Sequence, residues 1–271
     1  MPLPLDRLSS SECAGITGIF TDLDDTLSEG GRVVPEAFAA LAEAQRAGLR
    51  TVIITGRPAG WVDHLARMWP VDGVVGENGG LWFWHDGEKL QRRFLQDAEE
   101  RALNRRRLRE LAESIPRRVP GSAVSVDQPY RELDLAVDFC EDVPALPEDA
   151  VDAIVAAFEQ AGATCKVSSI HVNGWFGEFD KLEGCRRFLA ERWGEDLPQA
   201  RERWAYFGDS ANDEPMFRFF PLGIGVANVA RFLPRMRHHP RYVAELPGGR
   251  GFAQGVRRIL SLRATSGDAV R

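Results

Sequence analysis

Short apolar runs that end in polar residues recur along this chain. Ile16 to Phe20, Arg50 to Ile54 and Trp204 to Phe207 are rich in β-branched or aromatic residues, as buried strands of a parallel sheet are. Helical spacing of apolar residues lies between such runs, for example at Leu182, Cys185, Phe188 and Leu189. The alternation predicts an α/β fold whose core is a doubly wound parallel sheet.

The first run leads directly into a cluster of acids, Asp22, Asp24 and Asp25, followed by Thr26. The carboxyl ends of strands are where open α/β sheets bind their ligands. Two carboxylates this close repel each other unless a proton or a cation separates them, which favours a divalent metal with oxygen ligands. An acidic turn that caps the next helix is the simpler interpretation of this segment alone.

Three further polar segments follow the same pattern. Thr55, Gly56 and Arg57 lie between a strand and a helix that a proline opens, which suits a phosphate cradle or a plain turn. Lys181 begins a helix, where a cation is unfavourable for the helix dipole and needs an anionic partner, unless it is simply a surface lysine. The run from Gly208 to Asp213 again places acids after a strand, in a site or in a capped turn.

Together, these segments resemble the four motifs of the haloacid dehalogenase superfamily of aspartate-nucleophile phosphotransferases, in the same order. The resemblance implies that Asp22 is the nucleophile and Asp24 the general acid and base. It also implies that Thr55 and Lys181 hold the phosphate and that Asp209 binds Mg²⁺, supported by Asp213. On this basis we expect the metal site to comprise Asp22, Asp24, Asp209 and Asp213, and the phosphate or substrate site to comprise Thr55, Gly56, Arg57, Asn78, Lys181 and Asn212.

The chemistry explains why such residues are needed. A carboxylate attacks a dianionic phosphate poorly unless a metal ion and a lysine neutralise the charge. One acid can then protonate the leaving oxygen and afterwards deprotonate the attacking water, which is the role expected of Asp24. Dehalogenation needs no such proton donor, so Asp24 favours phosphoryl transfer.

The chain between Thr55 and Lys181 is much longer than one helix and one strand require. Apolar periodicity there predicts a hairpin, a helix from Asp97 to Ser114, two strands, a second helix from Pro147 to Ala161 and two more strands. The order αββαββ predicts an inserted α+β cap domain over residues 85–175, with the catalytic core in 1–84 and 176–271. The cap resembles that of subfamily IIB of the superfamily, the Cof-type phosphatases that include enzymes acting on sucrose phosphate, trehalose phosphate and mannosyl-3-phosphoglycerate.

A cap in this position implies that the leaving group is recognised mainly by cap residues. Candidate contacts are Arg131, His171 and Asn173, although His171 is also a plausible structural histidine. Three consecutive aromatic residues, Trp82 to Trp84, are interpreted as hairpin core, with sugar stacking as the alternative.

Composition and charge narrow the class of protein. The 271 residues carry a formal net charge of −6, which argues against a nucleic-acid binder. No apolar stretch has the length of a signal-peptide core or a membrane span, so we expect a cytoplasmic protein with no membrane partner. The four cysteines are too far apart to form a C-x-x-C pair, and we expect free thiols.

The sequence therefore predicts a magnesium-dependent phosphatase of a small phosphorylated metabolite, with a sugar phosphate as the expected substrate. A phosphomutase similar to phosphomannomutase, using the same nucleophile, is the first alternative, and a noncatalytic sugar-phosphate binding module is the second. A monomer and a homodimer are both compatible with the sequence.

Overall fold

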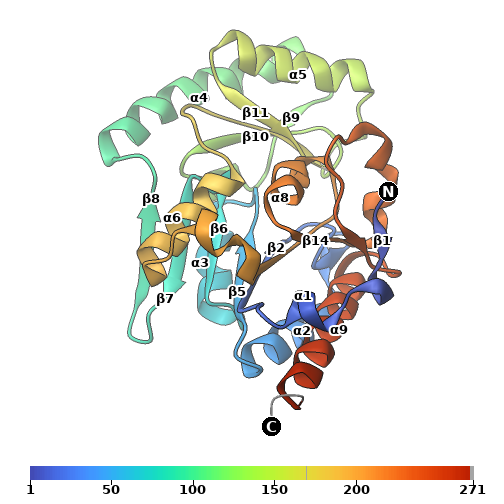
Figure 1. The fold of residues 1–271 in the computed structure, drawn as a ribbon. Coiled ribbons are helices and arrows are strands. Elements are labelled where there is room, and N and C mark those ends of the chain that lie inside the picture. The colour runs from blue at the N-terminus through green and yellow to red at the C-terminus, as the bar shows by residue number, and fades with distance from the viewer. Residues whose placement is uncertain (169, 269–271) are drawn as a thin grey trace.

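The centre of the molecule is a nine-stranded sheet with the order β1-β15-β14-β13-β2-β5-β6-β7-β8 (Figure 1). This computed structural model describes residues 1–168 and 170–268. All neighbours from β1 to β6 in this order pair in parallel, and β7 and β8 are antiparallel. The strands are β1 Leu3–Pro4, β2 Gly18–Asp22, β5 Arg50–Ile54, β6 Gly73–Gly76, β7 Leu81–His85, β8 Leu90–Phe94, β13 Trp204–Gly208, β14 Leu222–Gly225 and β15 Tyr242–Val243.

Helices cover both faces of this sheet, as predicted for a doubly wound α/β core. They are α1 Ser10–Cys13, α2 Pro35–Arg46, α3 Ala59–Met68, α6 Lys181–Trp193, α7 Leu197–Ala200, α8 Glu214–Phe219 and α9 Gly248–Asp268. Alternation along the strands separates two apolar cores. Ile19 and Ile53 lie in the core with α2, α3 and α9, whereas Phe20 and Val52 lie in the core with α6 and α8.

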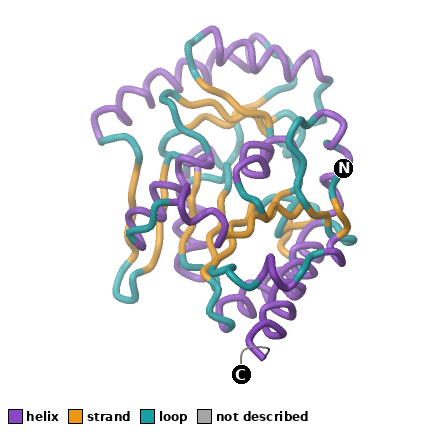
Figure 2. Tube along the Cα trace, viewed as in Figure 1, coloured by secondary structure: helices purple, strands orange, loops and turns teal. Residues whose placement is uncertain are grey.

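A second, antiparallel sheet lies above the carboxyl ends of the central strands. It has the order β11-β12-β10-β9, and two helices form the outer layer over it (Figure 2). A third core, with Leu108, Val137 and Phe158, fills the space between these helices and the sheet. The elements are α4 Ala98–Arg118, β9 Ala123–Val124, β10 Asp134–Asp138, α5 Glu148–Gln160, β11 Thr164–Val167 and β12 His171–Trp175, in the order αββαββ.

The predicted boundary between the core and the inserted domain falls within the hairpin of β7 and β8. The boundary at residue 85 placed β8 in the inserted domain, but its backbone pairs with β7 along its whole length, from Leu90 to Phe94. Trp82, Phe83 and Trp84 are buried in the cores of the central sheet, as the hairpin-core interpretation predicts. The hairpin therefore extends the central sheet; the domain boundaries themselves stay a prediction.

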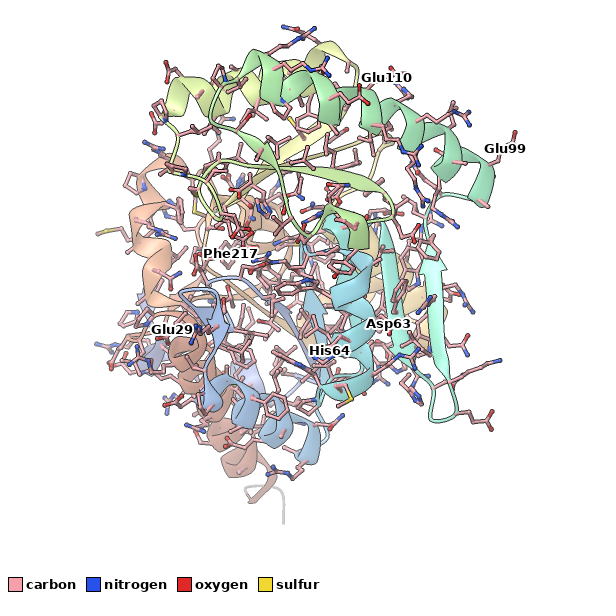
Figure 3. All side chains as sticks on the ribbon, turned by 180° about the vertical axis from the view of Figure 1, so that it is seen from behind. Glu29, Asp63, His64, Glu99, Glu110 and Phe217 are labelled. Carbon is pink, nitrogen blue, oxygen red and sulfur yellow. The ribbon has the colours of Figure 1, made fainter. Side chains whose placement is uncertain are left out.

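Charged side chains mark the outer surfaces of the helices. Figure 3 shows Glu99 and Glu110 of α4 pointing away from the small sheet, and Asp63 and His64 on α3. The same view shows Glu29 in the short hairpin of β3 Ser28–Glu29 and β4 Arg32–Val33, which follows the first acid cluster. Among the described residues, no helix combines the length and the apolar character needed to cross a membrane.

Candidate active site

Three neighbouring parallel strands bring the predicted site residues to one edge of the sheet. Asp22 ends β2, whose neighbours are β5 on one side and β13 on the other. Thr55 directly follows β5, and Asp209 directly follows β13. The motifs thus meet because the carboxyl ends of parallel strands share an edge.

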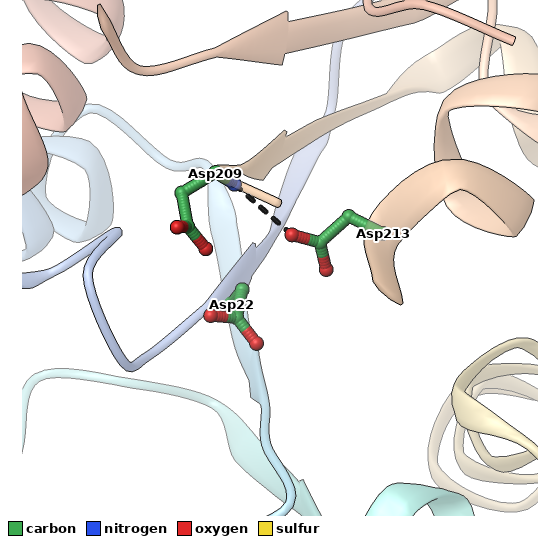
Figure 4. A group of neighbouring side chains, drawn as sticks. All are labelled: Asp22, Asp209 and Asp213. Carbon is green, nitrogen blue, oxygen red and sulfur yellow. Dashed lines mark hydrogen bonds between the residues drawn. The ribbon is translucent and has the colours of Figure 1, made fainter. Parts of the chain in front are cut away.

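Asp22, Asp209 and Asp213 form a buried carboxylate cluster at this edge (Figure 4). One oxygen of each lies within 4.8 Å of those of the other two. Lys181 is the cation that balances it: its Nζ lies 2.6 Å from Asp22 Oδ1 and 3.0 Å from Asp213 Oδ1. The lysine is itself only 8% exposed, so the ion pairs are shielded from water.

The charges of this cluster are incompletely balanced. Burial raises the pKa of Asp22 to about 8, an effect that the Lys181 ammonium opposes and the Asp213 carboxylate strengthens. Burial and the neighbouring Asp213 also raise the pKa of Asp209 well above its usual range. Three buried carboxylates face the Lys181 ammonium and the exposed Arg231 guanidinium, which lies 3.9 Å from Asp209 Oδ2. One more negative charge than positive suits a further cation. Oxygen ligands fit Mg²⁺, which keeps several waters and needs few protein groups.

Asp213 has both oxygens engaged by the protein. Oδ1 accepts from Lys181 and, at 2.5 Å, from the hydroxyl of Tyr206; Oδ2 accepts from the backbone N–H groups of Asp209 at 3.0 Å and Ser210 at 3.2 Å. Asp213 therefore holds Lys181 and Asp209 in place. Tyr206 is a functional residue that sequence reasoning missed, because a tyrosine within a strand looks like an ordinary core residue.

Close glycine packing positions Lys181 at the first turn of α6. The preceding Asp180 caps the helix by accepting the N–H of Glu183 at 2.9 Å. Gly79 has φ +104° and lies so near that a Cβ on it would be 2.0 Å from the carbonyl oxygen of Asp180. A Cβ on Gly184 would in turn be 2.5 Å from Gly79 Cα. Only glycines allow this approach, which brings Lys181 against the strand ends.

Asp24 lies outside the carboxylate cluster in this conformation, although it was predicted as a metal ligand. Its carboxylate accepts from Arg57 Nε at 3.1 Å and from Arg57 Nη2 at 3.0 Å. The same Arg57 Nη2 donates to Glu141 Oε1 at 3.0 Å. Glu141 follows β10 of the small sheet, and its hydrogen bond with Arg57 links that sheet to the central one. Sequence reasoning missed Glu141 because Arg57 and Glu141 are 84 positions apart in the chain.

A small cavity of about 30 Å³ lies among these groups. That volume holds a water molecule or two, so the two sheets are closed over the site. Thr55 does not line it: the side chain is fully buried and its hydroxyl accepts the N–H of Arg57 at 2.9 Å. The other predicted residues that line it are Asp22, Asp24, Gly56, Arg57, Asn78, Lys181, Asp209 and Asn212, joined by Arg131, His171 and Asn173 from the small sheet.

Arg131 lines the cavity, but its charge is already balanced. Its guanidinium donates to Asp127 at 3.0 Å, to Asp134 at 2.9 Å and to the carbonyl oxygen of Gly56 at 2.9 Å. Its side chain is fully buried. Two carboxylates on one guanidinium leave no excess positive charge for a substrate anion. Arg131 thus joins the small sheet to the phosphate-cradle segment.

Glu77 is a third residue that sequence reasoning missed. Its buried carboxylate accepts backbone N–H groups from Ala59 at 2.8 Å, Glu132 at 2.9 Å and Leu133 at 2.6 Å. Burial, with a smaller contribution from the charge of Asp134, raises its pKa to about 8. In the sequence it is an acid in a glycine-rich turn. The available signal was its position between the apolar pair Val74–Val75 and Leu81.

Comparison with known proteins agrees with this architecture. Residues 19–105 match the family model described as haloacid dehalogenase-like hydrolase. No curated protein matches the chain. The family-model match agrees with the predicted resemblance to the haloacid dehalogenase superfamily over residues 19–105. For the chain as a whole, the solved structures show a shared fold.

Three solved structures illustrate the shared fold. A Thermoplasma acidophilum protein has 21% sequence identity and a TM-score of 0.69, covering 91% of this chain and 99% of its own. The sucrose-phosphatase of Synechocystis, solved with sucrose and phosphate, has 15% identity and a TM-score of 0.62, covering 89% and 97%. A subclass IIB sugar phosphatase of the superfamily has 16% identity and a TM-score of 0.59, covering 89% and 98%.

Proposed function

We propose that this protein is a magnesium-dependent phosphatase that hydrolyses a small phosphorylated metabolite through a phosphoryl intermediate on Asp22. The observation that carries the proposal is the position of Asp22. It ends the central strand, 2.6 Å from Lys181, within a cluster of three buried carboxylates. Such a cluster suits a reaction that brings a nucleophilic carboxylate, a phosphate dianion and a divalent cation together.

A sugar phosphate is the substrate class that we propose. The sucrose-phosphatase and the subclass IIB sugar phosphatase each match 89% of this chain in fold. Their identities are low, so they support the substrate class by analogy of fold. A cytoplasmic location, and a monomeric or homodimeric state, stay predictions from the sequence.

Asp22 and Asp209 would hold the Mg²⁺ ion, which supplies charge neutralisation for the transferring phosphoryl group. Lys181 binds a phosphate oxygen and reduces the repulsion between the dianion and the Asp22 carboxylate. Asp213 fixes the positions of Lys181 and Asp209 by accepting a hydrogen bond from each. Gly56 and Asn78 both line the cavity wall. Gly56 offers a backbone N–H to the phosphate, and Asn78 offers its side-chain amide to the rest of the substrate.

Asp24 performs the proton transfers. Protonated, it gives its proton to the leaving oxygen while Asp22 Oδ attacks phosphorus; ionised, it then takes a proton from the water that hydrolyses the aspartyl phosphate. Arg57 fixes the direction of the Asp24 carboxylate through its paired hydrogen bonds. The cycle returns both aspartates to their starting states and releases inorganic phosphate.

Phosphate release from a panel of sugar phosphates, with and without Mg²⁺, tests the proposal. We expect release that requires both Mg²⁺ and Asp22, with Asp22→Asn folded but inactive. Isomerisation of a sugar phosphate that depends on a bisphosphate and liberates no phosphate would instead identify the phosphomutase. Binding of sugar phosphates with neither reaction would identify a noncatalytic module.

A further inference from the structure

Two more cavities lead away from the catalytic one, between the small sheet and helices α6 and α8. The second has a volume of about 50 Å³ and shares Asn78, Lys181 and Asn212 with the catalytic cavity. The third has a volume of about 640 Å³ and shares Lys166, Leu182 and Pro215 with the second. The three therefore adjoin in series, from the strand ends outward.

The second cavity contains two buried donors that have no hydrogen-bond partner among the described residues. They are the side-chain amide Nδ2 of Asn78 and the indole Nε1 of Trp175. Asn78 is 8% exposed and Trp175 is fully buried, and both line this cavity. A buried donor without an acceptor costs about 1–3 kcal/mol. Acceptor atoms of a ligand that occupied this cavity would offer partners to both donors.

The third cavity is strongly cationic. Its basic lining residues are Lys166, Arg201, Arg218 and Arg237, with the single acid Glu214; His238 also lines it. Glu214 is already engaged, since it accepts the backbone N–H groups of Arg237 and His238 and contacts the His238 ring. In the part of the chain that the structure describes, no carboxylate forms an ion pair with Lys166, Arg218 or Arg237. This concentration of positive charge occurs in a chain whose net charge is −6.

Lys166 connects the cationic cavity to the catalytic one. It lies on β11 directly opposite Asn173 of β12, which lines the catalytic cavity. Cross-strand partners in an antiparallel pair project from the same face of the sheet. Lys166 is therefore on the face of the small sheet that covers the active site, at the junction of the second and third cavities.

We propose that this route binds the leaving group of the substrate and that the leaving group ends in a second anion, a carboxylate or a phosphate. The inference rests on the proposed phosphatase function and narrows its substrate to metabolites with two acidic groups. Asn78 and Trp175 donate to oxygens of the leaving group in the narrow second cavity. Lys166 and Arg218 bind the terminal anion in the wide third cavity.

Matched pairs of phosphate esters test this specificity. The first pair is 6-phosphogluconate and glucitol 6-phosphate, which differ by a carboxylate; the second is glucose 1,6-bisphosphate and glucose 6-phosphate, which differ by a phosphate. We expect kcat/KM to be at least about tenfold higher for the diacid of one pair, equivalent to about 1.4 kcal/mol. The pair that responds distinguishes carboxylate from phosphate.

Substitutions then locate the effect. Lys166→Gln and Arg218→Gln should each remove most of the preference for the diacid and leave kcat/KM for the monoacid unchanged. Lys89→Gln, on the exposed turn before β8, and Arg106→Gln, on the exposed face of α4, are the matched controls and should retain the full preference. Equal kcat/KM for both members of both pairs, or preferences unaffected by Lys166→Gln, would overturn the inference while leaving the phosphatase intact.

Binding to Asp22→Asn separates this inference from the proposed function. Calorimetry with the same four compounds, in the presence of Mg²⁺, needs no turnover. If a diacid binds more tightly than its monoacid partner and Lys166→Gln abolishes that difference, the result supports the proposed site for the second anion even if no ester is hydrolysed. If the wild-type enzyme releases phosphate but binds monoacid and diacid equally well, the site for the second anion is contradicted and the phosphatase function is not.

Discussion

Asp22 and Asp24 are two residues apart, yet they meet opposite environments. The Asp22 side chain is 8% exposed and bound to Lys181, whereas the Asp24 side chain is 28% exposed and bound to Arg57. A nucleophile needs a fixed position beside a cation, and a proton carrier needs access to water and to the leaving oxygen. The two environments fit the two roles proposed for these carboxylates.

Asp24→Asn should lower kcat by about 10²–10⁴-fold, because an amide neither gives nor takes the proton. KM should change little, since Asn keeps an oxygen for Arg57. The melting temperature should also stay close to that of the wild type. Steady-state kinetics and a thermal melt measure all three.

Asp25→Asn is the matched control for that variant. Asp25 has φ +57°, a conformation that asparagine tolerates, and its side chain forms a 3.7 Å ion pair with the exposed Arg231. Its kcat should remain within a few fold of the wild type. Near-normal kcat in Asp24→Asn would remove Asp24 from the mechanism.

The sequence predicts well which residues come together in the site. It predicts poorly which side-chain atoms form hydrogen bonds there. Asp22 and Asp209 converge because each follows an apolar strand, a pattern visible in the sequence. The direction of Asp24 toward Arg57 depends on side-chain rotamers, and the burial of Thr55 away from the cavity depends on a local turn. Neither leaves a periodic signal.

At the scale of elements, the turn after β6 connects the two sheets. Glu77 has φ +45° and directs its carboxylate to the first residue of α3 and to the segment that leads into β10. Its carboxylate oxygens accept hydrogen bonds from the backbone N–H groups of Ala59, Glu132 and Leu133. The turn therefore fixes where the small sheet sits above the strand ends.

Glu77→Ala should lower the free energy of unfolding by at least about 2 kcal/mol, since it leaves several buried N–H groups without an acceptor. Chemical denaturation measures the change. Glu132→Ala is the control, because the Glu132 side chain is 38% exposed and forms an ion pair with the exposed Arg105. This substitution should cost no more than about 1 kcal/mol. Equal effects of the two substitutions would contradict the role of Glu77.

The elements of the small sheet were predictable, but their attachment was not. Clean alternation gave β10 and β12, and helical spacing gave α4 and α5. The acceptor role of Glu77 requires residues 55 to 56 positions away in the chain, a relation that spacing does not encode. Similarly, β8 joined the central sheet because its partner β7 belongs to it, although its own pattern is compatible with either sheet.

For the whole molecule, contacts between the two sheets hold a closed state. Arg131 donates to the Gly56 carbonyl oxygen, and Arg57 donates to Glu141. The catalytic cavity of about 30 Å³ is too small for a sugar phosphate, so the proposed substrate would require the sheets to separate. Glu141 is well placed to stabilise closure, since His171 Nε2 lies 2.8 Å from its Oε2.

The contribution of Glu141 should depend on pH. Hydrogen bonding from His171, strengthened by Arg57, lowers the pKa of Glu141 to about 2 in the folded protein, from an ordinary value of 4.5. A lowered pKa stabilises the folded state above pH 4.5, and this contribution is lost as the pH falls toward 2.

Thermal melts of the wild type and Glu141→Gln between pH 6 and pH 3 test that linkage. The wild type should be more stable at pH 6, and the difference should shrink as the pH falls, because protonated Glu141 resembles glutamine. Asp142→Asn is the neighbouring control and should show no such convergence. A difference that stays constant from pH 6 to pH 3 would exclude a titrating Glu141 contact.

The phosphoryl intermediate on Asp22 is the central claim, and mass spectrometry of acid-quenched enzyme tests it most directly. During turnover of a sugar phosphate with Mg²⁺, the peptide that contains Asp22 should carry a phosphoryl group. The adduct should be absent from Asp22→Asn, and that variant should release no phosphate. Phosphate release by Asp22→Asn, or a phosphoryl group on a different residue during turnover, would contradict the account.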